Sequence, residues 1–149
     1  MKKIAIGSDH IGLNHKTFLI EKLTTQGYEL LDVGTFDEKR TDYPLYAEKV
    51  ALAIQDGKVE RGILICGTGI GISIAANKFS HIRCALCSDE YSALMSREHN
   101  DSNVIAFGAK VISPEKSLSL ATLWLNTLYE GGRHQQRLDM INIFEQYHH

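Results

Sequence analysis

The run GILIC at residues 62–66 leads into the turn GTGIG at residues 67–71 and then into ISIAAN at residues 72–77. A short apolar run bounded by glycines predicts a buried strand, and the glycine turn predicts a helix start with free backbone N–H groups. Such a strand delivers the thiol of Cys66 to the turn. A thiolate and an anionic group are both stabilised there, because the N–H groups and the positive end of the helix dipole face them. The stretch therefore indicates an active site.

Strand and helix signals alternate along the whole chain in the same way. Strands are expected at residues 2–7, 29–33, 62–66, 83–87 and 102–107, and helices at 13–25, 45–55, from the glycine turn onward, 90–98 and 114–128, with a last amphipathic segment at 133–144. This alternation predicts βαβ units with right-handed crossovers. We therefore predict an α/β fold, a three-layer αβα Rossmann-like sandwich with a five-stranded parallel sheet, in a single domain over residues 1–149.

Ligands of open parallel sheets bind beyond the carboxyl ends of the strands. This rule brings polar segments of the chain to one rim, at residues 7–10, 34–44, 66–71, 87–89 and 108–110. The sequence thus places the expected cleft beside Cys66.

The composition favours a small enzyme with a separately bound ligand. With 16 Lys+Arg against 18 Asp+Glu, a formal net charge of −2 and 8% aromatic residues, the chain has neither a basic field for nucleic acid nor a basic face for a membrane. Its apolar runs are too short for a signal segment or a membrane span. We therefore expect a cytoplasmic protein that binds no nucleic acid and no membrane.

Cys84 and Cys87 form a CxxC pair within a predicted strand. Residues three apart on a strand point to opposite faces, which suits neither a redox pair nor a structural zinc site. We interpret both as structural cysteines that are at least half buried and reduced.

The glycine turn differs from two familiar phosphate-binding loops. Its third glycine falls one position too early for the dinucleotide fingerprint, and it lacks the Gly-Lys-Ser/Thr ending of a phosphate loop. Two interpretations stay open from the residues alone. The glycines serve only a tight strand-to-helix connection, or their N–H groups form a hole for an oxyanion or enediolate.

Several motifs together resemble the series of the type B ribose-5-phosphate isomerases. They are GSDHIG at 7–12, RTDYP at 40–44, ICGTGIGISIAANK at 65–78, SREHNDSNV at 96–104 and YEGGRHQQR at 129–137. Related members of that family act on six-carbon sugar phosphates such as allose 6-phosphate or galactose 6-phosphate. The resemblance therefore implies an aldose-ketose isomerase of sugar phosphates, with ribose 5-phosphate as the expected substrate and a six-carbon sugar phosphate as the alternative.

The resemblance implies a role for each matching residue. Cys66 would be the base that moves a proton between C2 and C1 of the open-chain sugar through an enediolate. The hydroxyl of Thr68 and the backbone of the turn would hold the developing oxyanion, and His99 would be the acid that helps to open the sugar ring. The backbone positions of the turn are Gly67, Gly69, Ile70 and Gly71.

The remaining implied positions bind substrate. Asn100 would bind a sugar hydroxyl, and Arg133 and Arg137 would clamp the phosphate. Further matching positions are Asp9, His10, Tyr43 and Lys110, the last of which stands where the family usually has arginine. No metal and no organic cofactor is expected for this proton transfer.

Each of these residues also has a structural interpretation. Asp9 is a candidate N-cap, His10 a candidate cap of the first helix, and Tyr43 a candidate turn-packing residue. The two arginines fit a solvated helix face, and His99 with Asn100 fits a helix end. A non-catalytic sugar-phosphate-binding module on the same fold is the competing class. Histidines without a partner in the sequence are expected on the surface, namely His15, His81, His148 and His149.

The order of the motifs raises a problem of distance. His99 and Asn100 precede the last strand and therefore lie at the amino end of the sheet, roughly one strand length of ~17 Å from Cys66. If both serve one substrate, they must come from a second subunit. We therefore expect a homodimer, alone or paired into a dimer of dimers, with shared active sites. The last helix, apolar at Leu138, Ile141 and Phe144 on one side, would pack across that interface. The sequence leaves open whether the arginines act in cis or in trans.

Overall fold

The structure, a computed structural model, describes residues 2–147. A parallel sheet of five strands forms its centre. The strands are β1 (Lys3–Ser8), β2 (Glu29–Asp32), β3 (Arg61–Cys66), β4 (Cys84–Leu86) and β5 (Val104–Gly108). They pair in the order β2-β1-β3-β5-β4, every pair parallel. The predicted α/β fold and parallel sheet are confirmed.

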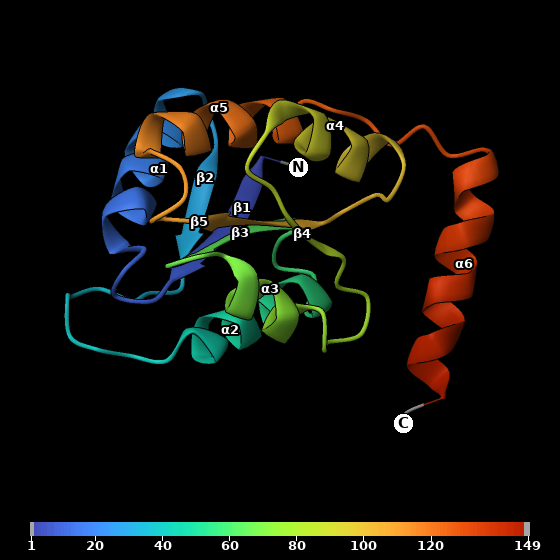
Figure 1. Ribbon diagram of the computed structural model, residues 1–149, viewed down its shortest axis with the longest axis horizontal. Coiled ribbons are helices and arrows are strands. Elements are labelled where there is room, and N and C mark those ends of the chain that lie inside the picture. The colour runs from blue at the N-terminus through green and yellow to red at the C-terminus, as the bar shows by residue number, and fades with distance from the viewer. Residues whose placement is uncertain (1, 148–149) are drawn as a thin grey trace.

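Helices cover both faces of the sheet (Figure 1). One face carries α1 (Leu13–Thr25), α4 (Glu90–Glu98) and α5 (Pro114–Leu125), and the other carries α2 (Tyr43–Gln55) and α3 (Ile70–Ala76). Side chains alternate along β3, so that Ile63 and Ile65 pack with α1 and α5, while Leu64 and Cys66 pack toward α2 and α3. The strands are apolar on both sides for this reason.

Most predicted boundaries lie within two residues of the observed ones, and the differences have local causes. Helix α5 ends at Leu125, earlier than predicted, because side chains cap its last turn. The Asn126 amide donates to Thr122 O at 2.8 Å, and the Thr127 hydroxyl donates to Leu123 O at 2.7 Å. These bonds satisfy carbonyls that would otherwise continue the helix.

The last helix, α6 (Arg133–Gln146), stands apart from the three layers (Figure 1). Only His134 and Leu138 of this helix are buried, whereas Ile141, Ile143 and Phe144 are exposed. A cavity of about 700 Å³ lies between α6 and the body, lined in part by apolar side chains. Glu145 near the end of α6 accepts the N–H of His81 at 3.0 Å, so the helix contacts the body at both ends while part of its apolar side stays exposed.

None of the helices within residues 2–147 is long and apolar enough to cross a membrane.

His15 is buried, although the sequence predicts a surface position for it. Its Nε2 donates to Ile112 O at 2.8 Å. The helix face of α1 therefore uses a histidine to satisfy a carbonyl of the loop after β5. His81 is exposed as expected, and His148 and His149 lie outside the described residues.

Ser8 provides a test of how the sheet is packed. Its Oγ is buried and has no hydrogen-bond partner among the described residues. An unsatisfied buried hydroxyl costs about 1–3 kcal/mol. The variant Ser8→Ala is therefore expected to raise the free energy of unfolding, measured by urea denaturation, by about 1 kcal/mol.

Ser102 is the matched control. It is 2% exposed against 0% for Ser8, yet its Oγ accepts the Nε1–H of Trp124 at 2.8 Å and lies 2.9 Å from Ser96 Oγ. Ser102→Ala is expected to lower the free energy of unfolding by about 1–3 kcal/mol, because the Trp124 donor loses its acceptor. Equal losses in both variants would contradict the assignment of Ser8 as unpaired.

Candidate active site

The strand order of the sheet reverses between β1 and β3, which lie next to each other at its centre. Strand β2 lies on one side of β1 and all later strands lie on the other, which makes the carboxyl ends of β1 and β3 the switch point where α/β sheets bind ligands. Ser8 pairs with Ile65 in this register. Asp9 and Cys66 therefore emerge next to each other at the rim.

The thiol of Cys66 is held by the glycine turn that follows it. Its side chain is 4% exposed, and the N–H of Gly69 donates to Sγ at 3.2 Å. The sulfur thus accepts a backbone hydrogen bond at the start of α3. The N–H of Ile70 donates instead to Thr68 Oγ1 at 3.1 Å. The N–H groups of Gly69 and Ile70 thus both donate to side chains of the same turn.

Two glycines of the turn are required by space and by backbone conformation. Gly69 has φ +78°, and a Cβ there would lie 2.8 Å from the backbone carbon of Phe107. A Cβ on Gly71 would lie 2.5 Å from the ring of Tyr43. The absence of a side chain at Gly71 therefore lets Tyr43 approach the turn from the start of α2.

Asp9 and His10 organise the turn after β1. Asp9 is buried, and its Oδ1 accepts the N–H groups of Ile11 and Gly12, each at 3.0 Å. The interpretation of Asp9 as a helix N-cap is wrong, because Gly12 is the N-cap of α1 and no side chain caps it. The Asp9 carboxylate holds the turn before the helix instead. His10 Nδ1 accepts the N–H of Thr41 at 3.2 Å, which leaves the proton on Nε2 in the neutral ring. This bond draws the loop before α2 toward the rim.

Lys110 completes the group at the rim. Its side chain is exposed, and its backbone N–H donates to Gly67 O at 2.9 Å. The neighbouring Ala109 donates to Cys66 O at 2.8 Å. The structure thus brings together the predicted positions Asp9, His10, Tyr43, Lys110 and the whole turn from Cys66 to Gly71.

His99 and Asn100 lie at the other end of the sheet. His99 is the C-cap of α4, and its backbone N–H donates to Met95 O. The buried Arg97 holds the following loop, because its Nη1 donates to Asp101 Oδ1 at 2.9 Å and to Ser102 O at 2.6 Å. Arg97 therefore holds the loop that follows His99 and Asn100.

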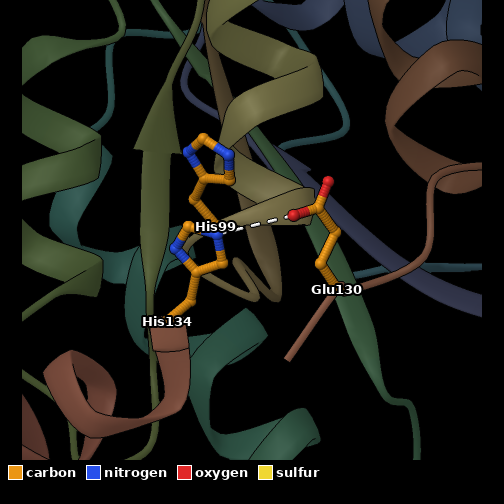
Figure 2. Close-up of side chains that lie close together, drawn as sticks. All are labelled: His99, Glu130 and His134. Carbon is orange, nitrogen blue, oxygen red and sulfur yellow. Dashed lines mark ion pairs between the residues drawn. The ribbon is translucent and has the colours of Figure 1, made fainter. Parts of the chain in front are cut away.

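Two residues that were not predicted as site residues from the sequence, His134 and Glu130, lie beside His99. The ring of His134 stacks on that of His99 with centroids 4.1 Å apart and planes at 16°. Glu130 Oε2 lies 3.4 Å from His134 Nε2, and Figure 2 shows the three side chains together. Both residues belong to the YEGGRHQQR motif and are four apart, a spacing that could have indicated the pair.

Arg133 and Arg137 share this end of the molecule with His99. Both are exposed on the first turns of α6, and Arg137 Nη1 donates to Arg133 O at 3.2 Å. They are therefore placed with His99 and not with Cys66 of the same chain.

The atoms of His99, Glu130 and His134 that could hold a metal lie within 4.8 Å of one another. A metal bound to imidazole lies in the plane of the ring, about 2.0–2.1 Å from the nitrogen. Near-parallel rings at 4.1 Å direct their lone pairs side by side and not toward a common point. The arrangement fits a stacked pair and not a metal centre.

The register of β3 and β5 gives the distance along the sheet between the residues around Cys66 and those around His99. Cys66 pairs with Gly108 and Gly62 pairs with Val104, so the start of β5 lies about four residues, or ~13 Å, from the level of the thiol. His99 precedes that point. One chain therefore carries two groups of functional residues at opposite ends of its sheet.

The other cysteines are structural, as predicted. Cys87 packs in the core on the α1 side, and Cys84 packs against the opposite core. Burial raises the pKa of the Cys87 thiol to about 11 and raises the pKa of Cys84 further. Both stay protonated at neutral pH and make poor nucleophiles.

Comparisons with known proteins agree with this geometry. The family model described as Ribose/Galactose Isomerase matches residues 4–141. The ribose-5-phosphate isomerase B of Escherichia coli is 54% identical over 98% of this chain and 98% of its own. A D-erythrulose-4-phosphate isomerase of Pectobacterium atrosepticum is 41% identical over 97% and 96% of the two chains. The solved ribose-5-phosphate isomerase B of Clostridium thermocellum superposes with a TM-score of 0.97 at 46% identity, covering 99% of each chain.

A pair of glycine variants tests the geometry of the turn. Gly69→Ala is expected to lower the free energy of unfolding by about 2 kcal/mol or more, because alanine is strained at positive φ and would collide with the backbone of β5. Gly67→Ala is the control, since the nearest atom to its Cβ is Ile11 Cδ1 at 3.7 Å. Its stability is expected within about 0.5 kcal/mol of the parent. Similar urea midpoints for both variants would contradict this description.

Proposed function

This chain belongs to the ribose/galactose isomerase family, and from that premise we propose that it interconverts ribose 5-phosphate and ribulose 5-phosphate. The observation that carries the proposal is the position of Cys66, whose Sγ accepts the N–H of Gly69 at the switch point of the sheet. A thiolate at this position is a base suited to remove a proton next to a carbonyl.

The proposed reaction is an internal transfer of hydrogen. The Cys66 thiolate accepts the proton from C2 of the open-chain aldose, and the electron pair forms the C1–C2 double bond of an enediolate with its charge on O1. A proton then moves from O2 to O1, and the thiol returns its proton to C1, which gives the ketose. The carbonyl carbon is reduced and the neighbouring carbinol is oxidised, so no external oxidant or reductant takes part.

The turn after Cys66 is proposed to stabilise the charge that develops on oxygen. Thr68 is exposed at this rim, and the N–H of Ile70 can exchange its present partner, Thr68 Oγ1, for an enediolate oxygen. Asp9, His10, Tyr43 and Lys110 surround the same rim and are proposed to bind the sugar phosphate. Of these, Lys110 offers a single ammonium group in place of a planar guanidinium fork.

The second group of residues is proposed to complete the site of another copy of this chain. The distance between Cys66 and His99 along the sheet supports this, as does the exposed apolar side of α6 beside its cavity. A second copy satisfies both features at once, because it covers the helix and brings His99 to a partner's thiol. Since Arg133 and Arg137 lie with His99, they act in trans on the phosphate in this proposal.

The substrate is tested by comparing turnover of ribose 5-phosphate and allose 6-phosphate. We expect kcat/KM to favour ribose 5-phosphate by about tenfold or more, as one additional carbon is commonly worth 10–200-fold. Cys66→Ala should lose about 10²–10⁴-fold in turnover, while Cys84→Ala, the matched control, should stay active. Full activity of Cys66→Ala would assign the base elsewhere, and a preference for allose 6-phosphate would overturn the choice of sugar.

The shared site is tested by mixing two inactive variants, Cys66→Ala and His99→Ala. If the sites are shared, random exchange places both native residues in about a quarter of all sites, so about a quarter of the parent activity should return. Mixing Cys66→Ala with a chain carrying both substitutions is the control and should recover nothing. Confirmed subunit exchange without recovery would show that each site is built within one chain.

A further inference from the structure

The orientation of the His99 ring depends on few contacts. It lies at the end of α4, half buried, and within residues 2–147 no hydrogen bond or ion pair holds its side chain. Its contact is the stack with His134, at 4.1 Å between centroids. A side chain at a helix end that lacks such a contact samples several rotamers. The stack is therefore what selects one orientation.

His134 is itself fixed from two sides. Its side chain is buried at the start of α6, and its Nε2 lies 3.4 Å from Glu130 Oε2. The backbone N–H of Glu130 donates to Glu98 O at 3.1 Å, directly before His99. Glu130 thus joins the end of α4 by its backbone and His134 by its carboxylate.

The turn between them brings the two rings together. Gly131 and Gly132 have φ of +68° and +60°, a conformation that favours glycine. The chain reverses there, and His134 N–H donates to Gly131 O at 3.2 Å. The double glycine therefore lets α6 begin with His134 against His99 (Figure 2).

We propose that Glu130 and His134 are positioning residues that orient His99 for opening the sugar ring, an inference that rests on the proposed function. His99 would donate its proton to the ring oxygen as the C1–O bond breaks, while the C1 hydroxyl loses its proton to water and becomes the aldehyde. Glu130 and His134 touch no reacting atom in this scheme. Their effect is to keep the acid in the orientation that this step requires.

This role predicts an effect that depends on the form of the substrate. Ribose 5-phosphate closes to a furanose, because its C4 hydroxyl is free. Erythrose 4-phosphate carries phosphate on C4 and cannot close that ring, so it enters as the open aldehyde. Loss of ring opening lowers turnover of the first sugar more than that of the second, whereas loss of phosphate binding or of folding lowers both.

The experiment compares kcat/KM for the two sugars in Glu130→Gln, His134→Ala and His134→Phe, with His99→Asn as the reference for lost ring opening. The ratio of ribose to erythrose turnover is expected to fall about tenfold or more in His134→Ala, approaching that of His99→Asn. His134→Phe should keep most of the ratio, since a flat ring still packs on His99. The ratio for Glu130→Gln should lie between those of His134→Ala and His134→Phe. Glu21→Gln, a surface control on α1, should leave the ratio unchanged.

Crystal structures of His134→Ala and His134→Phe supply a second measurement that needs no turnover. The His99 ring is expected to change rotamer in the first variant and to stay in place in the second. An unchanged His99 ring in His134→Ala, or equal losses with both sugars, would overturn the inference. Failure of the proposed function would look different, since the parent enzyme itself would then fail to convert ribose 5-phosphate.

Discussion

Parallel pairing of β3 with β5 is the constraint from which the arrangement of the functional residues follows. All carboxyl ends of a parallel sheet meet at one edge, so Cys66 and Gly108 end side by side. The same pairing keeps residues that precede β5 at the opposite edge, where His99 caps α4. A protein of this fold can use both edges for one reaction only by bringing a second chain to the first, which is why assembly and chemistry are linked in the proposed function.

Close approach of backbone to backbone is what makes the edge around Cys66 chemically useful. A Cβ on Gly108 would lie 2.5 Å from Thr68 O, so the turn lies almost on the end of β5. Gly69 takes a positive φ and directs its N–H at the sulfur. Any larger residue at these positions would push the turn away from the thiol. The close packing of the turn on β5 therefore also sets the surroundings of the Cys66 thiol.

Helix α6 combines two roles along its length. Its first turn carries Arg133 and His134 beside His99, while its later part presents Ile141 and Phe144 to the outside. A helix that packs poorly on its own domain while its first turn is tied to α4 is suited to carry groups into another site. The helix is tied to the domain at both ends, by the backbone bond of Glu130 to Glu98 before it and by Glu145 Oε1, which accepts the N–H of His81 at 3.0 Å.

The sequence by itself determined the elements and the location of the thiol, because these depend on near neighbours. Helix α1 spans residues 13–25, as its spacing of apolar residues and the following glycine predict. The turn after Cys66 was equally evident from its glycines, and the family from the order of its motifs. Such signals act over a few residues, within the reach of backbone sterics and side-chain periodicity.

Only the tertiary structure decided which distant residues meet. It placed β5 between β3 and β4, buried His15 under a carbonyl of another loop, and stacked His134 on His99. No periodicity of the sequence predicts any of these contacts. They arise when separately predictable elements pack, because the energy of each contact depends on the shape and polarity of a partner that lies far away in sequence.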